Sequence, residues 1–178
     1  MIDQIFDDCK KQLKAALKYK KHAFRFFTLA TRNLNGDSNL RTVVLRDFDA
    51  EQLQFTIFTD ARSKKVKELK ENSNAQFLFY DSKRMIQLIF SVKMIEIDYD
   101  DSIYNSLPDA SKRDYSSLQT PGSKIKSPDQ VSYDDSKKHF IKINFKSLRL
   151  EYLRLKRPNH IRAIFNLNDS WEGQFLVP

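Results

Sequence analysis

The chain has 178 residues, of which 40 % are hydrophobic and 30 % are charged, and its formal net charge is +8. This composition is typical of an ordered globular protein, and the length suffices for one domain with a substantial core. No apolar run approaches the roughly 18 residues of a transmembrane helix, and the N-terminal segment lacks the apolar centre of a signal peptide. We therefore expect a cytoplasmic protein whose residues 1–178 form a single domain, with no membrane partner.

The positive charge is compatible with nucleic acid, an anionic membrane or a phosphorylated small molecule as partner. The basic residues are scattered along the chain and form no stripe interleaved with exposed aromatic residues, which single-strand binders use. We therefore expect no nucleic-acid partner and favour a small-molecule ligand. Cys9 is the only cysteine, and His22, His139 and His160 lie far apart, so neither a disulfide nor a metal site is expected.

The predicted elements alternate between a few helices and many strands. Apolar residues recur at spacings of three and four through residues 2–20, which predicts an amphipathic N-terminal helix. Further helices are expected near 63–71 and 99–107. Aromatic and β-branched residues predict strands over 24–30, 40–48, 53–59, 75–80, 85–97, 140–145, 149–155, 161–167 and 171–177. Closely spaced strands with few helices between them predict a mainly β fold, a closed or partly closed antiparallel barrel with peripheral helices.

The segment 108–136 is polar and contains Pro108, Pro121, Gly122 and Pro128. We expect a long loop there, with room for a helical turn. Loops of this length are uncommon in compact domains unless they have a function or are mobile.

The stretch from Arg41 to Lys65 carries the clearest chemistry. Its first strand has an arginine at each end, Arg41 and Arg46, with an apolar run between them. Side chains alternate along a strand, so the two arginines project from opposite faces. Cations at both ends of an apolar strand can lie beside a flat, anionic ligand.

The start of the following helix is a candidate phosphate site. Ser63 or Asp60 can cap this helix, and its first N–H groups are free to bind an anion. Lys64 and Lys65 oppose the helix dipole at this position, a conflict that a bound dianion would remove. The alternative is that both lysines simply point into water.

The order of these motifs resembles pyridoxamine 5'-phosphate oxidase and its FMN-binding relatives. The resemblance begins with the motif R-T-V-V-L-R, which is followed by F-T-D-x-R-S-K-K and then by a strand that carries Gln87. The last strands of that family are similar to three motifs near the end of the chain, L-E-Y-L-R-L, N-H-I-R and W-E-G-Q-F-L-V-P. The resemblance covers roughly residues 24–178. It implies a six-stranded antiparallel split β-barrel of Greek-key topology with FMN as cofactor. It also implies a homodimer with two FMN molecules at its interface.

By position, the resemblance implies three groups of cofactor contacts. The phosphate would be bound by Arg41, Lys64 and Lys65, with help from Ser63. The ribityl chain and the ring edge would lie along Thr59 and the backbone of the Arg41 strand, Gln87 would hydrogen-bond the flavin, and Arg162 would reach it from the partner subunit. The complete set is Arg41, Thr42, Val43, Val44, Thr59, Ser63, Lys64, Lys65, Gln87 and Arg162.

The chain departs from the oxidase pattern mainly at the substrate. Leu107 and Pro158 stand where the oxidase has arginines that contact substrate. Each lost charge-assisted contact is worth about 1.5–3 kcal/mol, so efficient oxidation of pyridoxamine phosphate is not expected. Arg46, Ser111 and His160 remain as candidate substrate contacts.

The favoured function is an FMN-dependent oxidoreductase of the pyridoxamine 5'-phosphate oxidase type, acting on a small molecule. Apart from His160 no acid–base residue stands out, so no catalytic residue is assigned. Two alternatives stay open at this point: an FMN carrier or sensor without turnover, and a flavin reductase that uses a nicotinamide donor. The sequence leaves the substrate and the electron donor open.

Overall fold

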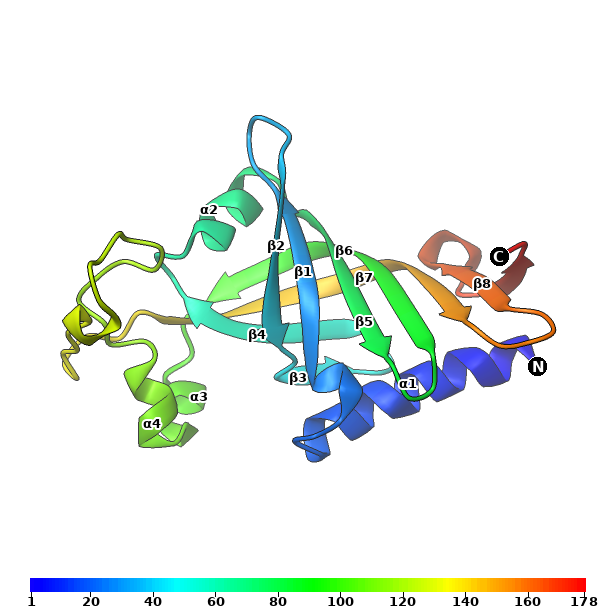
Figure 1. Ribbon diagram of the computed structural model, residues 1–178, viewed down its shortest axis with the longest axis horizontal. Helices are drawn as coiled ribbons and strands as arrows, with labels where there is room; N and C mark the ends of the chain where they lie inside the picture. Colours follow the sequence, from blue (N-terminus) through cyan, green and yellow to red (C-terminus); the bar gives the residue numbers. More distant parts are fainter.

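Strict alternation of buried and exposed side chains in the middle strands builds one two-faced sheet. In chain order the strands are β1 (Phe26–Arg32), β2 (Ser38–Val44), β3 (Asp47–Asp49), β4 (Gln54–Asp60), β5 (Asn74–Asp81), β6 (Ile86–Asp98), β7 (Phe140–Arg154), β8 (Ile161–Asn166) and β9 (Gly173–Leu176). The computed structural model describes residues 1–178, and all nine strands belong to one antiparallel sheet (Figure 1). One face of this sheet forms the core, and the other is the outer face.

The strand order shows how the barrel is formed and where it is split. The order is β2-β1-β5-β6-β7-β4-β3, with β8 paired to β7 and β9 to β8. No ladder joins β2 to β4, and these edges approach through a backbone hydrogen bond from Arg46 N–H to the Thr56 carbonyl (3.0 Å). Strands β1, β2, β4, β5, β6 and β7 are the six expected for a split barrel. The short β3 and the pair β8–β9 bring the number of strands in the sheet to nine.

Strand β7 differs from the sequence-based expectation of two separate strands. It runs through 15 residues without interruption. Its first half pairs with β4 and its second half with β8 on the same side, while β6 pairs along the other side. Register shifts in β6 at Ser91/Val92 and at Met94/Glu96 accommodate this long pairing, because bulges increase local bend and twist.

Phenylalanine rings fill the barrel. Phe55 lies edge-on to Phe77 (5.4 Å between ring centroids) and to Phe90 (4.9 Å), and Phe77 lies edge-on to Phe145 (5.0 Å). Large rings suit a barrel interior because each buries much apolar area and edge-to-face pairs add stability. This core fixes the strands that carry the candidate site.

Four short or amphipathic helices surround the sheet (Figure 1). They are α1 (Ile2–Lys18), α2 (Lys64–Glu71), α3 (Asp101–Ser106) and α4 (Asp109–Arg113). Helix α1 lies against β3 and β9, and α2 lies against β1. No helix is long and apolar enough to span a membrane.

The segment 108–136, expected as a loop, contains α4 and a single 3-10 turn (Pro128–Gln130). Backbone hydrogen bonds also join its two limbs, from Leu118 N–H to the Ser132 carbonyl (2.8 Å) and from Asp134 N–H to the Ser116 carbonyl (2.9 Å). The segment is therefore folded back on itself and otherwise irregular.

Candidate functional site

Helix α2 begins directly after β4, at the split edge of the barrel. Its N-cap, Ser63, makes no side-chain capping bond, and its first two residues are Lys64 and Lys65. The backbone N–H groups of both lysines make no hydrogen bond within the protein, because the first N–H groups of a helix have no carbonyl partner within that helix. The start of α2 therefore presents free donors and the positive end of the helix dipole.

Lys65 is held at this helix start by hydroxyl groups alone. Its Nζ donates to Oγ1 of Thr59 (2.8 Å) and to Oγ of Ser63 (3.2 Å), and both of these residues are buried. No carboxylate lies within ion-pair distance of Lys65. Burial, followed by the charge of Arg41, lowers the pKa of Lys65 below its ordinary value. A half-buried cation without an anionic partner is the strongest indication of an anion site in the molecule.

Arg41 acts on Lys65 through its charge, but its own hydrogen bonds go to other residues. It projects from β2 on the core side, opposite Leu29 of β1. Its guanidinium donates from one terminal nitrogen to Oγ1 of Thr31 (2.5 Å) and from the other to Oε2 of Glu68 (3.1 Å). The site is therefore built from β1, β2, β4 and α2 together.

Glu68 is a buried carboxylate in the second turn of α2, with 2 % exposure. Besides Arg41, it accepts hydrogen bonds from Thr31 Oγ1 (2.5 Å) and Asn39 Nδ2 (2.7 Å), and Lys64 Nζ lies 3.6 Å from it. Burial alone would raise the pKa of Glu68, but the hydrogen bonds from Thr31 and Arg41 outweigh burial, and the pKa lies below its ordinary value. Glu68 is therefore charged at neutral pH.

These groups fit a phosphate monoester. Arg41, Lys64 and Lys65 bring three positive charges and Glu68 one negative charge, which leaves two positive charges. A phosphate monoester carries about −1.5 to −2 at neutral pH. Hydroxyls, free helix N–H groups and cations are the donors that bind phosphate in proteins.

The outer face of the sheet carries other predicted residues. Thr42 and Val44 project outward from β2, whereas Val43 packs against the core. Gln87 of β6 is half-buried and lies opposite Tyr80 of β5. On the same face, Arg162 of β8 donates to Oε2 of Glu151 (3.1 Å).

The family model for the pyridoxamine 5'-phosphate oxidase FMN-binding domain matches residues 7–96, about half of the chain. The chain belongs to this family. The expected cofactor, FMN, is thereby confirmed. The match includes the β2 strand, the α2 start and Gln87.

Curated relatives in the family are pyridoxine/pyridoxamine 5'-phosphate oxidases. The chain is 30 % identical over 105 residues to that of Nostoc sp., covering 58 % of this chain and 48 % of the relative. It is 33 % identical over 91 residues to oxidase 2 of Arabidopsis thaliana, covering 50 % of this chain and 46 % of the relative. The match spans about half the length of the curated relatives.

Solved structures share the fold over nearly the whole chain. An oxidase-related FMN-binding protein from Nostoc punctiforme has a TM-score of 0.75 and 20 % identity, covering 96 % of both chains. PhzG from Burkholderia lata, solved with tetrahydrophenazine-1-carboxylic acid, has a TM-score of 0.76 and 16 % identity, covering 96 % of this chain and 90 % of that chain. The expectation of a mainly antiparallel split barrel is confirmed.

Within this oxidase-family chain, the residues predicted to contact substrate are dispersed. The Arg46 guanidinium lies 5.4 Å from the ring centre of Phe58, and Ser111 belongs to α4. His160 is exposed in the turn between β7 and β8, where its Nδ1 accepts a hydrogen bond from Lys156 N–H (3.1 Å). Figure 1 shows α4 and this turn at opposite ends of the molecule, so one chain does not bring Ser111 and His160 together.

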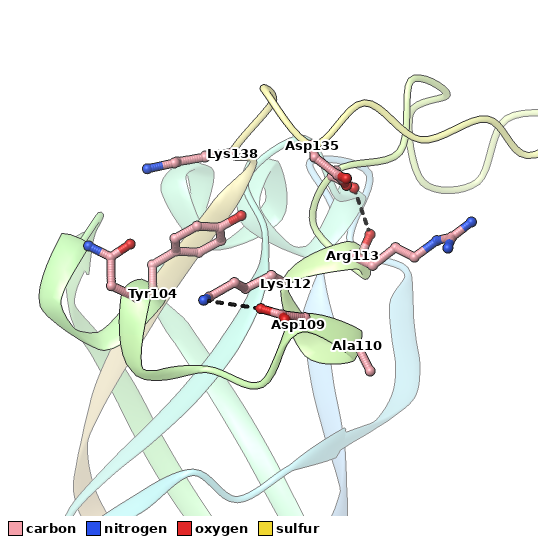
Figure 2. Close-up of a pocket in the computed structure, with 9 residues that line it drawn as sticks. Tyr104, Asp109, Ala110, Lys112, Arg113, Asp135 and Lys138 are labelled. Atoms are coloured by element: carbon pink, nitrogen blue, oxygen red, sulfur yellow. Dashed lines mark hydrogen bonds and ion pairs between the residues drawn. The ribbon is translucent and has the colours of Figure 1, made fainter.

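A cavity of about 540 Å³ beside α3 and α4 shares no residue with the candidate phosphate site (Figure 2). Two of its three lining cations have acidic partners, with Lys112 Nζ 3.5 Å from Asp109 and Lys138 Nζ 3.6 Å from Asp101, and the guanidinium of the third, Arg113, lies 4.5 Å from the ring centre of Tyr133. Figure 2 shows the ring of Tyr104 between the two lysines. The lining thus carries three cations and the carboxylates of Asp109 and Asp135, so its charges nearly balance and the cavity is a weaker candidate for an anion than the start of α2.

Sequence reasoning missed four polar residues in and beside the candidate phosphate site: Thr31, Asn39, Arg62 and Glu68. The spacing of Lys64 and Glu68 by four residues is typical of a helix-surface ion pair and could have drawn attention to Glu68. The contacts of Glu68 with Thr31 and Arg41 join residues far apart in the chain, and no local pattern indicates them.

Proposed function

We propose that the protein is an FMN-dependent oxidoreductase that acts on a small organic molecule as a homodimer. The observation that carries this proposal is Lys65, a half-buried cation whose Nζ contacts only hydroxyl groups at the free start of α2. The family supplies the cofactor, and Lys65 and its neighbours supply a place for the cofactor's phosphate.

The phosphate would be bound by Lys65, Lys64 and Arg41. Ser63 and Thr59 would add hydroxyl groups, which now accept hydrogen bonds from Lys65 and can instead donate to phosphate oxygens. The free N–H groups at the start of α2 complete the set. These groups orient the cofactor from its phosphate end.

The flavin ring would lie on the outer face of the sheet. The half-exposed side chains and backbone of Thr42 and Val44 offer an edge for it, and the amide of Gln87 offers hydrogen bonds. When bound, FMN supplies reversible transfer of a hydride or of single electrons. The protein's part is to hold the ring in place and to exclude water from one side of it.

The outer face also supports the homodimer. It carries an exposed apolar patch that includes Phe26, Leu78 and Tyr80, with exposures of 55 %, 37 % and 47 %. Exposed patches of large apolar side chains mark interaction surfaces. In an isologous dimer the same patch is used twice, and Arg162 of one subunit can approach the flavin of the other.

Dimer formation would also assemble the substrate site. Helix α4, which carries Ser111, and the turn between β7 and β8, which carries His160, lie at opposite ends of the molecule (Figure 1), and Arg46 lies near Tyr115, four residues after Ser111. A second copy across the outer face can bring its His160 to the Arg46 end of the first. We infer that Arg46, Ser111 and His160 contact the substrate and that the site is shared between subunits.

Absorbance and binding measurements test the cofactor assignment. We expect the purified protein to bind FMN, and Arg41→Ala or the double variant Lys64→Ala/Lys65→Ala to weaken FMN binding by about ten- to a hundredfold. Riboflavin, which lacks the phosphate, should bind these variants as it binds the wild type. Lys67→Ala, an exposed change on the same helix, is the control. Equal losses for FMN and riboflavin would contradict this placement of the phosphate.

A further inference from the structure

Glu68 is an acidic side chain at a site that is otherwise built for an anion. It is almost fully buried, although α2 has a solvent-facing side on which Lys67 and Glu71 are exposed. A carboxylate at this depth costs free energy unless donors surround it. Three donors contact it directly, from Thr31, Asn39 and Arg41.

The contacts of Glu68 and Arg41 form a closed ring. One terminal nitrogen of Arg41 donates to Thr31 Oγ1, the hydroxyl of Thr31 donates to Glu68 Oε2, and the other terminal nitrogen of Arg41 donates to the same Oε2. Two bonds from two nitrogens of a planar guanidinium fix its plane as well as its position. Arg41 is therefore held in one orientation by protein groups alone.

A count of donors shows what remains for a ligand. A guanidinium has five N–H groups. In Arg41 three of them are directed at Thr31, at Glu68 and at the Leu29 carbonyl (3.4 Å). Two N–H groups are left for a ligand, Nε–H and one on the nitrogen that contacts Glu68.

The charge of Glu68 also allows two cations to lie close together. Burial and then the charge of Arg41 lower the pKa of Lys65, and the carboxylates of Asp60 and Glu68 act on this pKa in the opposite sense. Without a nearby carboxylate, Arg41 would be repelled from Lys65 whenever no phosphate is present. Glu68 thus keeps the cations assembled before the ligand arrives.

We propose that Glu68 is a positioning residue of the phosphate site, which acts through Arg41 by holding its guanidinium, directly and through Thr31, in the orientation that binds the phosphate of FMN. This inference rests on the proposed function, because it needs the phosphate to lie beside Arg41. A carboxylate near a phosphate could instead act only as a competing charge. The two roles predict opposite changes in affinity when Glu68 loses its charge.

The experiment is a double-mutant cycle on the purified full chain, with FMN and riboflavin affinities measured by fluorescence titration. Glu68→Gln keeps the size of the side chain but cannot accept from all three donors. We expect it to weaken FMN binding about tenfold and to leave riboflavin binding unchanged. On an Arg41→Ala background the same change should have no further effect on FMN. Glu71→Gln, an exposed acid on the same helix, is the matched control and should change neither ligand.

A second variant tests the same role in case Glu68→Gln fails to fold. Thr31→Val removes the bridging hydroxyl with little change in shape, and should weaken FMN about three- to tenfold without affecting riboflavin. Unchanged or tighter FMN binding by Glu68→Gln would overturn the positioning role, as would a full loss that persists on the Arg41→Ala background. If Arg41→Ala itself weakens FMN and riboflavin equally, the phosphate site is misplaced and the proposed function fails with it.

Discussion

The Arg62 guanidinium joins the turn between β4 and α2 to Ser117 in the segment after α4. One terminal nitrogen of Arg62 donates to the Ser117 carbonyl (2.9 Å) and to its Oγ (3.2 Å). The same guanidinium pairs with the buried carboxylate of Asp60 (2.7 Å and 3.0 Å), whose hydrogen bond raises the pKa of Arg62. The irregular segment is thus fastened to the residues that precede the phosphate site.

We predict that Arg62→Ala releases this segment. The change leaves the buried Asp60 without its ionic partner and removes the contacts with Ser117. Hydrogen bonds to charged groups are worth about 1.5–3 kcal/mol, so the melting temperature should fall by several degrees. Limited digestion with subtilisin should cut within residues 118–130 at least several times faster than in the wild type. Arg32→Ala is the control, and cleavage at the wild-type rate would show that Arg62 does not hold the segment.

The second prediction concerns the apolar outer face. Leu78 lies at its centre on β5, opposite Thr28 of β1 and Ile89 of β6. We expect the wild type to sediment as a dimer at micromolar concentration and Leu78→Glu to sediment as a monomer, because a charge in an apolar isologous interface is buried twice. Gln52→Glu, in the exposed turn between β3 and β4, should remain dimeric. A monomeric wild type would contradict the shared site.

Lys65 leads to a prediction about pH. Burial and the charge of Arg41 lower its pKa, so in the free protein Lys65 loses its proton at a lower pH than an ordinary lysine. Phosphate binds the protonated form and raises this pKa, so FMN affinity should fall as the pH rises through the lowered pKa of the free protein. Titrations with FMN and with riboflavin between pH 7 and 10 measure the effect. The ratio of the two affinities removes the contribution of the flavin ring's own titration, which both ligands share.

Lys65→Arg supplies the control for the pH experiment, because a guanidinium stays protonated over this range. The FMN-to-riboflavin affinity ratio of this variant should change little with pH. If the wild-type ratio is equally constant, Lys65 does not contact the phosphate.

The sequence was most informative where the relevant signal is local. Lys64 and Lys65, directly after a residue that can cap a helix, indicated the candidate phosphate site, because their conflict with the helix dipole can be recognised from neighbouring residues alone. Strand alternation likewise placed Thr42 on one face and Arg41 on the other. The position of Glu68 in the site could not be predicted, since its partners Thr31 and Arg41 reach it through the packing of α2 against β1 and β2.

The strand pattern had a similar limit. Residues 146–148 interrupt the apolar alternation, which suggested a break between two strands, but β7 continues through them. Ser147 is fully buried there, and its N–H donates to the Leu53 carbonyl at the point where β7 changes partner from β4 to β8. Such a change of partner is a property of the whole sheet and leaves no clear local signal.

The last prediction is that the FMN-loaded protein has little pyridoxamine 5'-phosphate oxidase activity. Leu107 and Pro158 occupy positions where the resemblance implies substrate-binding arginines, and neither side chain can donate a hydrogen bond. The structure further shows Leu107 packed against the apolar cluster of Tyr104, Tyr115 and Phe140. Losing two charged contacts of about 1.5–3 kcal/mol each lowers kcat/KM by roughly two to four powers of ten.

Other cations near Ser111 are poorly placed to compensate. Lys112 Nζ lies 3.5 Å from Asp109, and the Arg113 guanidinium lies 4.5 Å from the ring centre of Tyr133. The test is to follow aldehyde formation from pyridoxamine phosphate with FMN-saturated protein, beside an authentic oxidase. We expect Leu107→Arg to raise kcat/KM measurably, since it restores one cation, whereas Leu118→Arg, an exposed change in the same segment, should not. Wild-type turnover within about a factor of ten of the turnover of the authentic oxidase would contradict the prediction. The variants Lys112→Ala and Arg113→Ala would then show which cation replaces the missing arginines.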